Sequence, residues 1–350
     1  MMENPRHSAR HVDEHRSKPP FFVVGSGRSG TTLLQALIDA HPNLSIPPES
    51  HLYDRIAPVF DTYGDLSIQS NRLRFIADLL ADAYIRQWRL DATPDEIEAR
   101  VIRGDRVGVI DALFSLFAQR QGASRWGDKT PDHIRCLDAI RADFPDAKLI
   151  HLVRDGRDRA EARRRMIWGP STPFGMAREW RDEVMLWKRF CDEHGSDGTL
   201  VVRYEDLVHA PRETMERVFE FLDEPYVDTV VNYASTPLTR TLSATQSEWH
   251  ASLGRGIFTR KVGIYRQALT RREIEIFESV ARDALVEYGY QPEFTAPRPA
   301  TWAERVRSAF SDVVLRWYRK LLNPYAAWLE VQFRLRLAQR QLIAATRSAG

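Results

Sequence analysis

The stretch FFVVGSGRSGTTLL, residues 21–34, decides the fold. Its first four residues are apolar and have the length and composition of a buried strand. A glycine-rich turn, GSGRSG, occupies residues 25–30, and apolar residues spaced along one helical face begin after Thr31. Glycines allow backbone N–H groups to converge on one point, and a helix N-terminus adds partial positive charge. The stretch therefore predicts a strand, an anion-binding turn and a helix.

The spacing of this turn is that of a P-loop with one change. Thr31 stands where a P-loop has its lysine, Thr32 keeps the hydroxyl position, and the cation comes earlier, at Arg28. A nucleoside triphosphatase needs that lysine on the β- and γ-phosphates. An ordinary glycine turn between a strand and a helix is the alternative interpretation. Because glycines, an arginine and two threonines occur together, the pattern favours a phosphoanhydride ligand that is not handled as ATP.

The composition is that of a globular protein. The 350 residues include 43% hydrophobic and 28% charged side chains, with a net charge of +2. Cys136 and Cys191 match no metal-ligand spacing and no disulfide framework, which suits a reducing compartment. No run approaches the roughly 20 apolar residues of a membrane span, and the polar start lacks the apolar segment of a secretory signal. The sequence predicts a cytoplasmic protein in which residues 1–18 form a disordered arm.

Strand and helix patterns alternate along the chain. After the first strand, further strands are expected at 44–46, 125–127, 148–154 and 199–204. Helical patterns cover 66–88, 94–103, 109–121 and 270–288. This alternation predicts an α/β fold, a P-loop-like parallel sheet flanked by helices, in one domain over residues 19–295.

The chain beyond residue 300 differs from this domain. Residues 301–350 contain nine basic and three acidic side chains, a net charge of +6. The ranges 302–322 and 325–346 both have helical apolar periodicity, so residues 300–350 predict a basic amphipathic helical tail. Such a stripe either docks onto the domain or dimerises, or it contacts a membrane surface, which would place the protein at that surface.

Charged residues follow several of the expected strands. Arg28 lies in the glycine turn, Glu49 follows the segment at 44–46, Lys129 follows the strand at 125–127, and Arg154 and Arg157 follow the strand at 148–154. In open parallel sheets, ligands bind at the carboxyl ends of the strands. We expect these five side chains to line one crevice. The four cations predict a ligand with more than one anionic group, and the carboxylate suits a general base.

Four ordered motifs carry a resemblance to a known family. They are FFVVGSGRSGTTLLQALIDAHPNLSIPPESHLY, WGDKTPDH, KLIHLVRDGRD and VVRYEDL. Together they resemble the sulfotransferases that use 3′-phosphoadenosine 5′-phosphosulfate, the bacterial members and the tyrosylprotein sulfotransferases above all. The resemblance covers residues 20–290. It implies a P-loop NTPase-like α/β fold, no metal, and transfer of a sulfuryl group to an acceptor hydroxyl or amine.

The resemblance also implies roles for individual residues on the donor side. The 5′-phosphosulfate would be held by the loop residues Gly27, Arg28, Ser29, Gly30, Thr31 and Thr32. Arg154 would bind the 3′-phosphate, and Tyr204 would lie near the nucleotide or only pack at a strand end. Family members usually have a second 3′-phosphate ligand, a serine, where this chain has Ala162. One of Arg163, Arg164 and Arg165 could replace it, although arginines on a helix face are by default solvated. Lys261, or Arg260, is the expected phosphate contact of a closing loop, and Ser247 is a further candidate.

On the acceptor side, Glu49 matches the carboxylate that acts as base in the tyrosylprotein enzymes. Lys129 and Arg28 would stabilise the transferring group. The alternative role for Glu49 is an ion pair with Arg28 that fixes the loop. His51 and His133 are the alternative bases.

Two other functions share parts of this pattern. A P-loop kinase or other NTPase is disfavoured by Thr31 and by the strand at 148–154, which runs into Arg154 and not into a magnesium-binding acid. A non-catalytic nucleotide-binding module is the second alternative, because Ala162 departs from the family pattern. The acceptor remains open among small molecules, lipids, carbohydrates and peptides, and nothing predicts nucleic-acid binding.

Overall fold

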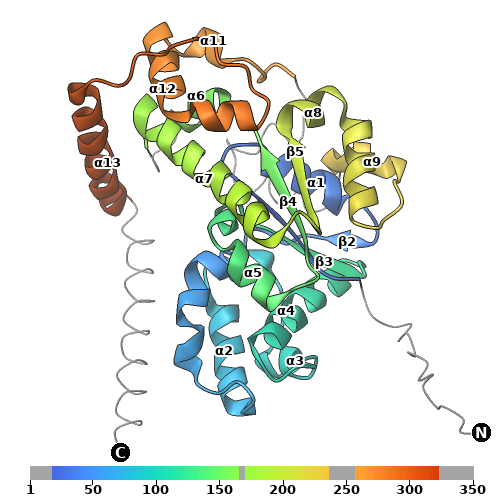
Figure 1. Cartoon of the computed structure of the whole chain (residues 1–350). Coiled ribbons are helices and arrows are strands. Elements are labelled where there is room, and N and C mark those ends of the chain that lie inside the picture. Colours follow the sequence, from blue (N-terminus) through green and yellow to red (C-terminus); the bar gives the residue numbers. More distant parts are fainter. Residues whose placement is uncertain (1–17, 165–169, 236–256, 258, 323–350) are drawn as a thin grey trace, which may run out of the picture.

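The computed structural model describes residues 18–164, 170–235, 257 and 259–322 (Figure 1). Its centre is a parallel sheet of five strands in the order β2-β3-β1-β4-β5. The strands are β1 (Phe21–Gly25), β2 (Leu44–Ser45), β3 (Arg125–Lys129), β4 (Lys148–Val153) and β5 (Thr199–Arg203). The α/β prediction is therefore confirmed, and the strand with the glycine turn is the central one.

Helices cover both faces of the sheet. In chain order they are α1 (Thr31–Asp39), η1 (Leu52–Ile56), η2 (Ala57–Tyr63), α2 (Gln69–Ala81), η3 (Ile85–Trp88), α3 (Pro94–Glu98), α4 (Arg106–Arg120), η4 (Pro131–Arg135), α5 (Leu137–Asp143), α6 (Gly156–Arg164), α7 (Pro173–His194), α8 (Tyr204–His209), α9 (Pro211–Phe221), η5 (Asp228–Ser235), α11 (Tyr265–Ala268), α12 (Arg271–Glu287) and α13 (Trp302–Leu322). Among the described helices, none is long and apolar enough to cross a membrane.

Strand β1 divides the core because alternate side chains point to opposite faces of a sheet. Phe22 and Val24 pack in one buried cluster with residues of α2, α4 and α5. Phe21 and Val23 pack in another, with residues of α1 and α9. All four side chains are at most 1% exposed, as expected for a central parallel strand.

Several element boundaries differ from the predictions. The helix expected over 66–88 ends at Ala81, because Asp82 takes an extended conformation and its carboxylate accepts a hydrogen bond from the Tyr84 amide. The helix expected over 94–103 ends at Glu98, and Asp105 caps the next one by accepting from the Gly108 amide. The helix expected over 302–322 has those bounds as α13. The N-terminal arm and the expected helix over 325–346 lie outside the described residues.

Candidate functional site

The carboxyl ends of the parallel strands gather the charged residues on one edge of the sheet. The glycine turn follows β1, Glu49 follows β2, and Lys129 ends β3. Arg154 follows β4, and Tyr204 begins α8 directly after β5. The chain leaves β1 in the middle of the sheet, between β3 and β4, which is where open α/β sheets bind ligands.

The glycine turn is held in a conformation that few sequences could adopt. Arg28 and Gly30 both have left-handed backbones, with φ of 75° and 105°. A Cβ atom on residue 30 would lie 2.5 Å from Cδ2 of Tyr204, so the ring of Tyr204 closes over a position that only glycine fills. The hydroxyl of Ser29 is buried and has no hydrogen-bond partner among the described residues. An unsatisfied buried hydroxyl beside a helix N-terminus fits an anionic ligand.

Side chains of α6 and α7 hold this turn in place through hydrogen bonds. Ser26 donates to Glu183 of α7, and Nε of Arg159 donates to the carbonyl of Gly27 at 3.0 Å. Glu183 also contacts Arg159 at 3.2 Å and Arg135 at 2.7 Å. The sequence analysis missed Arg159 and Glu183. The density of arginines in RDGRDRAEARRR was the available signal, but by itself it indicates a solvated helix face.

Cations converge beside the turn. The guanidinium of Arg154 stacks on the ring of Tyr204 at 4.6 Å and donates to the Lys261 carbonyl at 2.6 Å. Burial lowers the pKa of Lys261, and Arg154 and Arg28 lower it further. Burial likewise lowers the pKa of Arg28, with Arg154 and Arg163 adding to the shift. Mutual repulsion of this kind is relieved when an anion binds between the cations.

Arg157 does not belong to this group, so that expectation is wrong. Its guanidinium is buried, contacts Asp155 at 2.7 Å and Glu278 at 2.6 Å, and lies 4.3 Å from the centre of the Tyr265 ring. Both carboxylates and the ring belong to the packing between α6, α11 and α12. Arg157 is therefore a structural residue.

Two of the arginines considered as substitutes for the serine that Ala162 replaces also form ion pairs within the domain. Arg163 is only 3% exposed, so it is not a solvated residue, and it pairs with Glu179 at 3.0 Å. Arg164 pairs with Glu273 at 2.5 Å. Arg165 and Ser247 lie outside the described residues.

Glu49 forms ion pairs with two neighbours. Its Oε1 lies 2.5 Å from Nζ of Lys129, and its Oε2 lies 3.4 Å from Nε2 of His51. Arg28, the expected alternative partner, also feels the charge of Glu49, which raises the pKa of Arg28 against the stronger effects of burial, Arg154 and Arg163. Burial alone would raise the pKa of Glu49, but Lys129, and after it His51, hold the pKa below its usual range. Glu49 is therefore a carboxylate at neutral pH, with 36% of its side chain exposed at the edge of the site.

The two alternative bases are less suited to take a proton from an acceptor. Burial alone would lower the pKa of His51, but Asp54 and Glu49 raise it to about 9, so its imidazole is already protonated at neutral pH. His133 is fully buried, its Nε2 accepts from the Tyr53 amide at 3.1 Å, and an acceptor has no access to it. His51 also has a left-handed backbone, with φ of 49°, and such strain is concentrated at functional sites.

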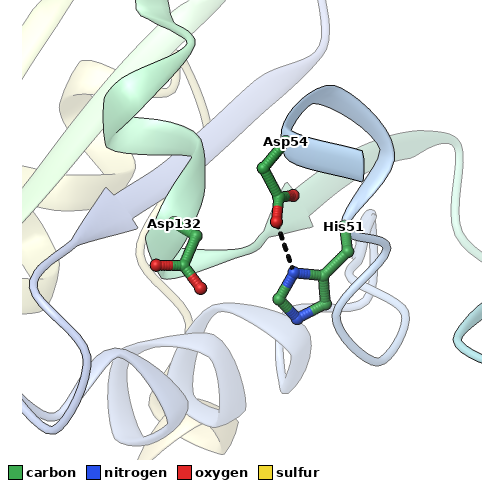
Figure 2. Close-up of side chains that lie close together, drawn as sticks. All are labelled: His51, Asp54 and Asp132. Atoms are coloured by element: carbon green, nitrogen blue, oxygen red, sulfur yellow. Dashed lines mark hydrogen bonds and ion pairs between the residues drawn. The ribbon is translucent and has the colours of Figure 1, made fainter. Parts of the chain in front are cut away.

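His51, Asp54 and Asp132 form a group whose ligand atoms lie close enough to hold a metal ion (Figure 2). Nδ1 of His51 lies 2.9 Å from Oδ2 of Asp54. Against the effect of burial, the nearby carboxylates raise the pKa of His51 to about 9, so a metal ion at this group would have to displace a proton from the ring. The described structure shows an ion pair between His51 and Asp54 here, and the prediction that the site works without a metal remains a prediction.

Comparisons with known proteins agree with this geometry. A sequence model described as "Sulfotransferase family" matches residues 19–228, and one described as "Sulfotransferase domain" matches residues 175–289. The protein-tyrosine sulfotransferase of Drosophila melanogaster is 28% identical over 224 residues, which are 63% of this chain and 41% of that protein. The nodulation protein NoeE of Sinorhizobium fredii is 25% identical over 327 residues, 85% of this chain and 73% of that protein. The chain spans about half the length of the first curated relatives that it matches.

Solved structures show the same fold. The sulfotransferase domain of the Synechococcus PCC 7002 olefin synthase has a TM-score of 0.54 at 24% identity, and covers 79% of this chain and 97% of its own. The sulfotransferase domain from the curacin biosynthetic pathway has a TM-score of 0.55 at 18% identity, with 78% and 98% covered. The first family model covers more than half of the residues, and its match includes the glycine turn, Glu49, Lys129, Arg154 and Tyr204. The chain therefore belongs to the sulfotransferase family.

Proposed function

We propose that this protein transfers a sulfuryl group from 3′-phosphoadenosine 5′-phosphosulfate to an acceptor hydroxyl or amine. The observation that carries the proposal is the combination of a backbone anion cradle, a buried unsatisfied Ser29 hydroxyl and converging cations on one side of a carboxylate–lysine pair. Such a donor has a phosphosulfate and a separate 3′-phosphate. It therefore has an anionic group for the cradle and another for Arg154.

On the donor side, the loop residues from Gly27 to Thr32 supply amides and hydroxyls to the phosphosulfate. Arg154 supplies a planar guanidinium to the 3′-phosphate, where it can engage two oxygens. Tyr204 holds that guanidinium in place by stacking on it. Lys261, whose carbonyl accepts from Arg154, adds a cation from the segment before α11.

On the acceptor side, Glu49 takes the proton of the acceptor as the new S–O or S–N bond forms, and the S–O bond to the nucleotide phosphate breaks. Lys129, 2.5 Å from Glu49, and Arg28 stabilise negative charge on the transferring group and the leaving oxygen. His51 positions Glu49, because its protonated ring bridges Glu49 and Asp54. This chemistry relies on placing and stabilising charge, as phosphoryl transfer does.

A P-loop kinase is the competing function, and β3 contains an acid that the sequence analysis did not consider. Asp128 lies beside β1, where its residue partner is Phe22. Its two carboxylate oxygens accept hydrogen bonds from Ser50 at 2.7 Å and Thr130 at 3.0 Å, and it is 1% exposed. A carboxylate engaged in this way is poorly placed to hold magnesium, and Thr31 provides no cation for a triphosphate.

Calorimetric titration separates the two functions. We expect 3′-phosphoadenosine 5′-phosphate to bind without added metal and more tightly than ATP with magnesium. Arg154→Ala should weaken this binding by about tenfold to a hundredfold, the value of a charge-assisted hydrogen bond. Arg181→Ala is the matched control, because its ion pair with Asp283 lies on the exposed face of α7. Tighter binding of ATP with magnesium would overturn the proposal.

An activity assay would identify the class of acceptor. Labelled donor should be offered to phenolic peptides, carbohydrates, lipids and small alcohols or amines. Relatives carry the names protein-tyrosine sulfotransferase and nodulation protein, so tyrosine peptides and carbohydrates are the first acceptors to test. Nucleotide binding without transfer to any class would instead favour a binding module.

A further inference from the structure

Helix α13 attaches to the domain by its small polar face. The hydroxyl of Ser308 lies 2.5 Å from that of Thr172, and the hydroxyl of Ser311 lies 2.7 Å from that of Ser171. Ser308 is 2% exposed, and a Cβ atom on Gly175 would lie 3.1 Å from its oxygen. Figure 1 shows α13 at the margin of the molecule, beside the start of α7. The contacts of α13 with the start of α7 are therefore made by small hydroxyls and by Arg305, whose guanidinium lies over the ring of Phe174.

The apolar side chains of α13 point away from the domain. Trp302 is 78% exposed, Phe310 is 69% exposed, and Val306 between them is 45% exposed. Val313 and Val314 continue the same stripe at 49% and 45%. An amphipathic helix normally turns its apolar face to the core. Because this helix is docked by the opposite face, none of the residues that the structure describes covers its apolar stripe, which leaves the stripe to a partner outside the domain.

The charges beside the stripe indicate which partner fits. Arg305 and Arg307 precede and follow Val306, so they lie about 100° to either side of it around the helix. Arg307 is exposed, whereas the guanidinium of Arg305 lies 5.9 Å over the ring of Phe174 in α7. Glu304, in contrast, is held toward the domain by Arg272 at 2.8 Å. Three more basic residues, Arg316, Arg319 and Lys320, follow in the sequence of α13, and residues 301–350 have a net charge of +6.

We infer that α13 lies on the surface of an anionic phospholipid bilayer, with its apolar stripe inserted at the headgroup boundary. An apolar stripe containing tryptophan and phenylalanine and flanked by arginines is typical of interfacial helices. A second copy of the chain would bring like charges together along both flanks of the stripe. A negatively charged lipid surface brings the opposite charge. The inference does not depend on the catalytic activity.

Vesicle co-sedimentation of the full chain tests the inference. We expect binding to vesicles of phosphatidylcholine with phosphatidylglycerol, much weaker binding to phosphatidylcholine alone, and release by salt. The double variant Trp302→Ser with Phe310→Ser should bind at least about tenfold more weakly, because two large apolar side chains no longer insert. Arg307→Glu should also weaken binding, through charge alone.

The matched control removes equally exposed apolar side chains elsewhere. Ile102 and Val286 are 93% and 58% exposed, and their double serine variant should bind vesicles like the unaltered chain. All variants should keep the melting temperature and nucleotide affinity of the unaltered chain, since the changed side chains face solvent. Equal vesicle binding by the Trp302 and Phe310 variant would overturn the inference, as would no binding at all. A lipid-free dimer that the same variant dissociates would assign the stripe to a second copy.

Discussion

Glu49→Gln provides the sharpest test of the proposed chemistry. The substitution keeps the shape of the side chain and an oxygen that can accept from Lys129, but it removes the negative charge and the ability to take a proton. We expect sulfuryl transfer to be lost while binding of 3′-phosphoadenosine 5′-phosphate is retained. General-base catalysis typically contributes a factor of about a hundred to ten thousand. Turnover should therefore fall by this factor, which corresponds to about 3–5 kcal/mol of activation free energy.

The cost to folding should be smaller than the cost to catalysis. Lys129 is 3% exposed, so losing its counter-charge leaves a buried ammonium group. Removing one member of a fully buried ion pair costs about 3–5 kcal/mol. Glu49 is 36% exposed, so water screens this pair, and the glutamine oxygen can still accept a hydrogen bond. We expect a loss of about 1–2 kcal/mol in the free energy of unfolding.

The measurement combines labelled-donor turnover, calorimetric nucleotide binding and urea unfolding on the same preparations. The control is Glu98→Gln, which removes the ion pair, also 2.5 Å, between Glu98 of α3 and Arg72 of α2. Figure 1 shows α3 at the opposite end of the molecule from α6. It should lose a similar amount of stability and no activity. Turnover above a tenth of the unaltered rate would refute the role of Glu49 as base. Loss of nucleotide binding together with turnover would instead give Glu49 a role in shaping the donor site.

Three further predictions concern the supports of the site. Gly30→Ala should cost about 1–2 kcal/mol for its left-handed backbone and more for the contact with Tyr204, so both the melting temperature and nucleotide affinity should fall; Tyr204→Ala in the same chain should restore part of the stability. The pKa of His51 is raised from 6.5 to about 9, so its ion pairs stabilise the fold fully below pH 6.5, and the contribution is lost as the pH rises through 9. His51→Gln should remove this pH dependence, up to about 3 kcal/mol, from urea unfolding curves. Arg159→Ala should weaken nucleotide binding by releasing the Gly27 carbonyl, and an unchanged affinity would contradict that support.

The positions of the candidate site residues in the fold could be predicted because each motif comes directly after, or ends, a buried strand. Parallel strands bring their carboxyl ends to one edge, so Arg28, Lys129 and Arg154 had to lie close together. The same argument failed for Arg157, which is only three residues beyond Arg154. Its direction depends on Glu278, a residue of α12 that is 121 positions away in the chain. No local pattern contains that information.

The sequence also could not determine which face of a helix packs against the domain. The stripe of α13 and its bounds follow from periodicity, but the side chains that meet the domain include Ser308 and Ser311, which no hydrophobic pattern selects. The arginines after Arg154 show the reverse, because charged side chains there are buried whereas the apolar stripe of α13 is exposed. Arg163 was by default expected to be solvated and Arg159 was not considered, yet both are buried because Glu179 and Glu183 of α7 neutralise them.

The charges of the site suggest how its donor side and its acceptor side depend on each other. Beside the cradle, Arg28, Arg154 and Lys261 repel one another, whereas Glu49 and Lys129 form a close pair. A donor with several negative charges would neutralise the first group and compete with Glu49 for Lys129. Because Lys129 makes the largest contribution that lowers the pKa of Glu49, weakening that pair would raise the pKa and strengthen the base. Glu49 would then be an effective base only when the donor is bound, and an acceptor that arrives first would meet a weak one.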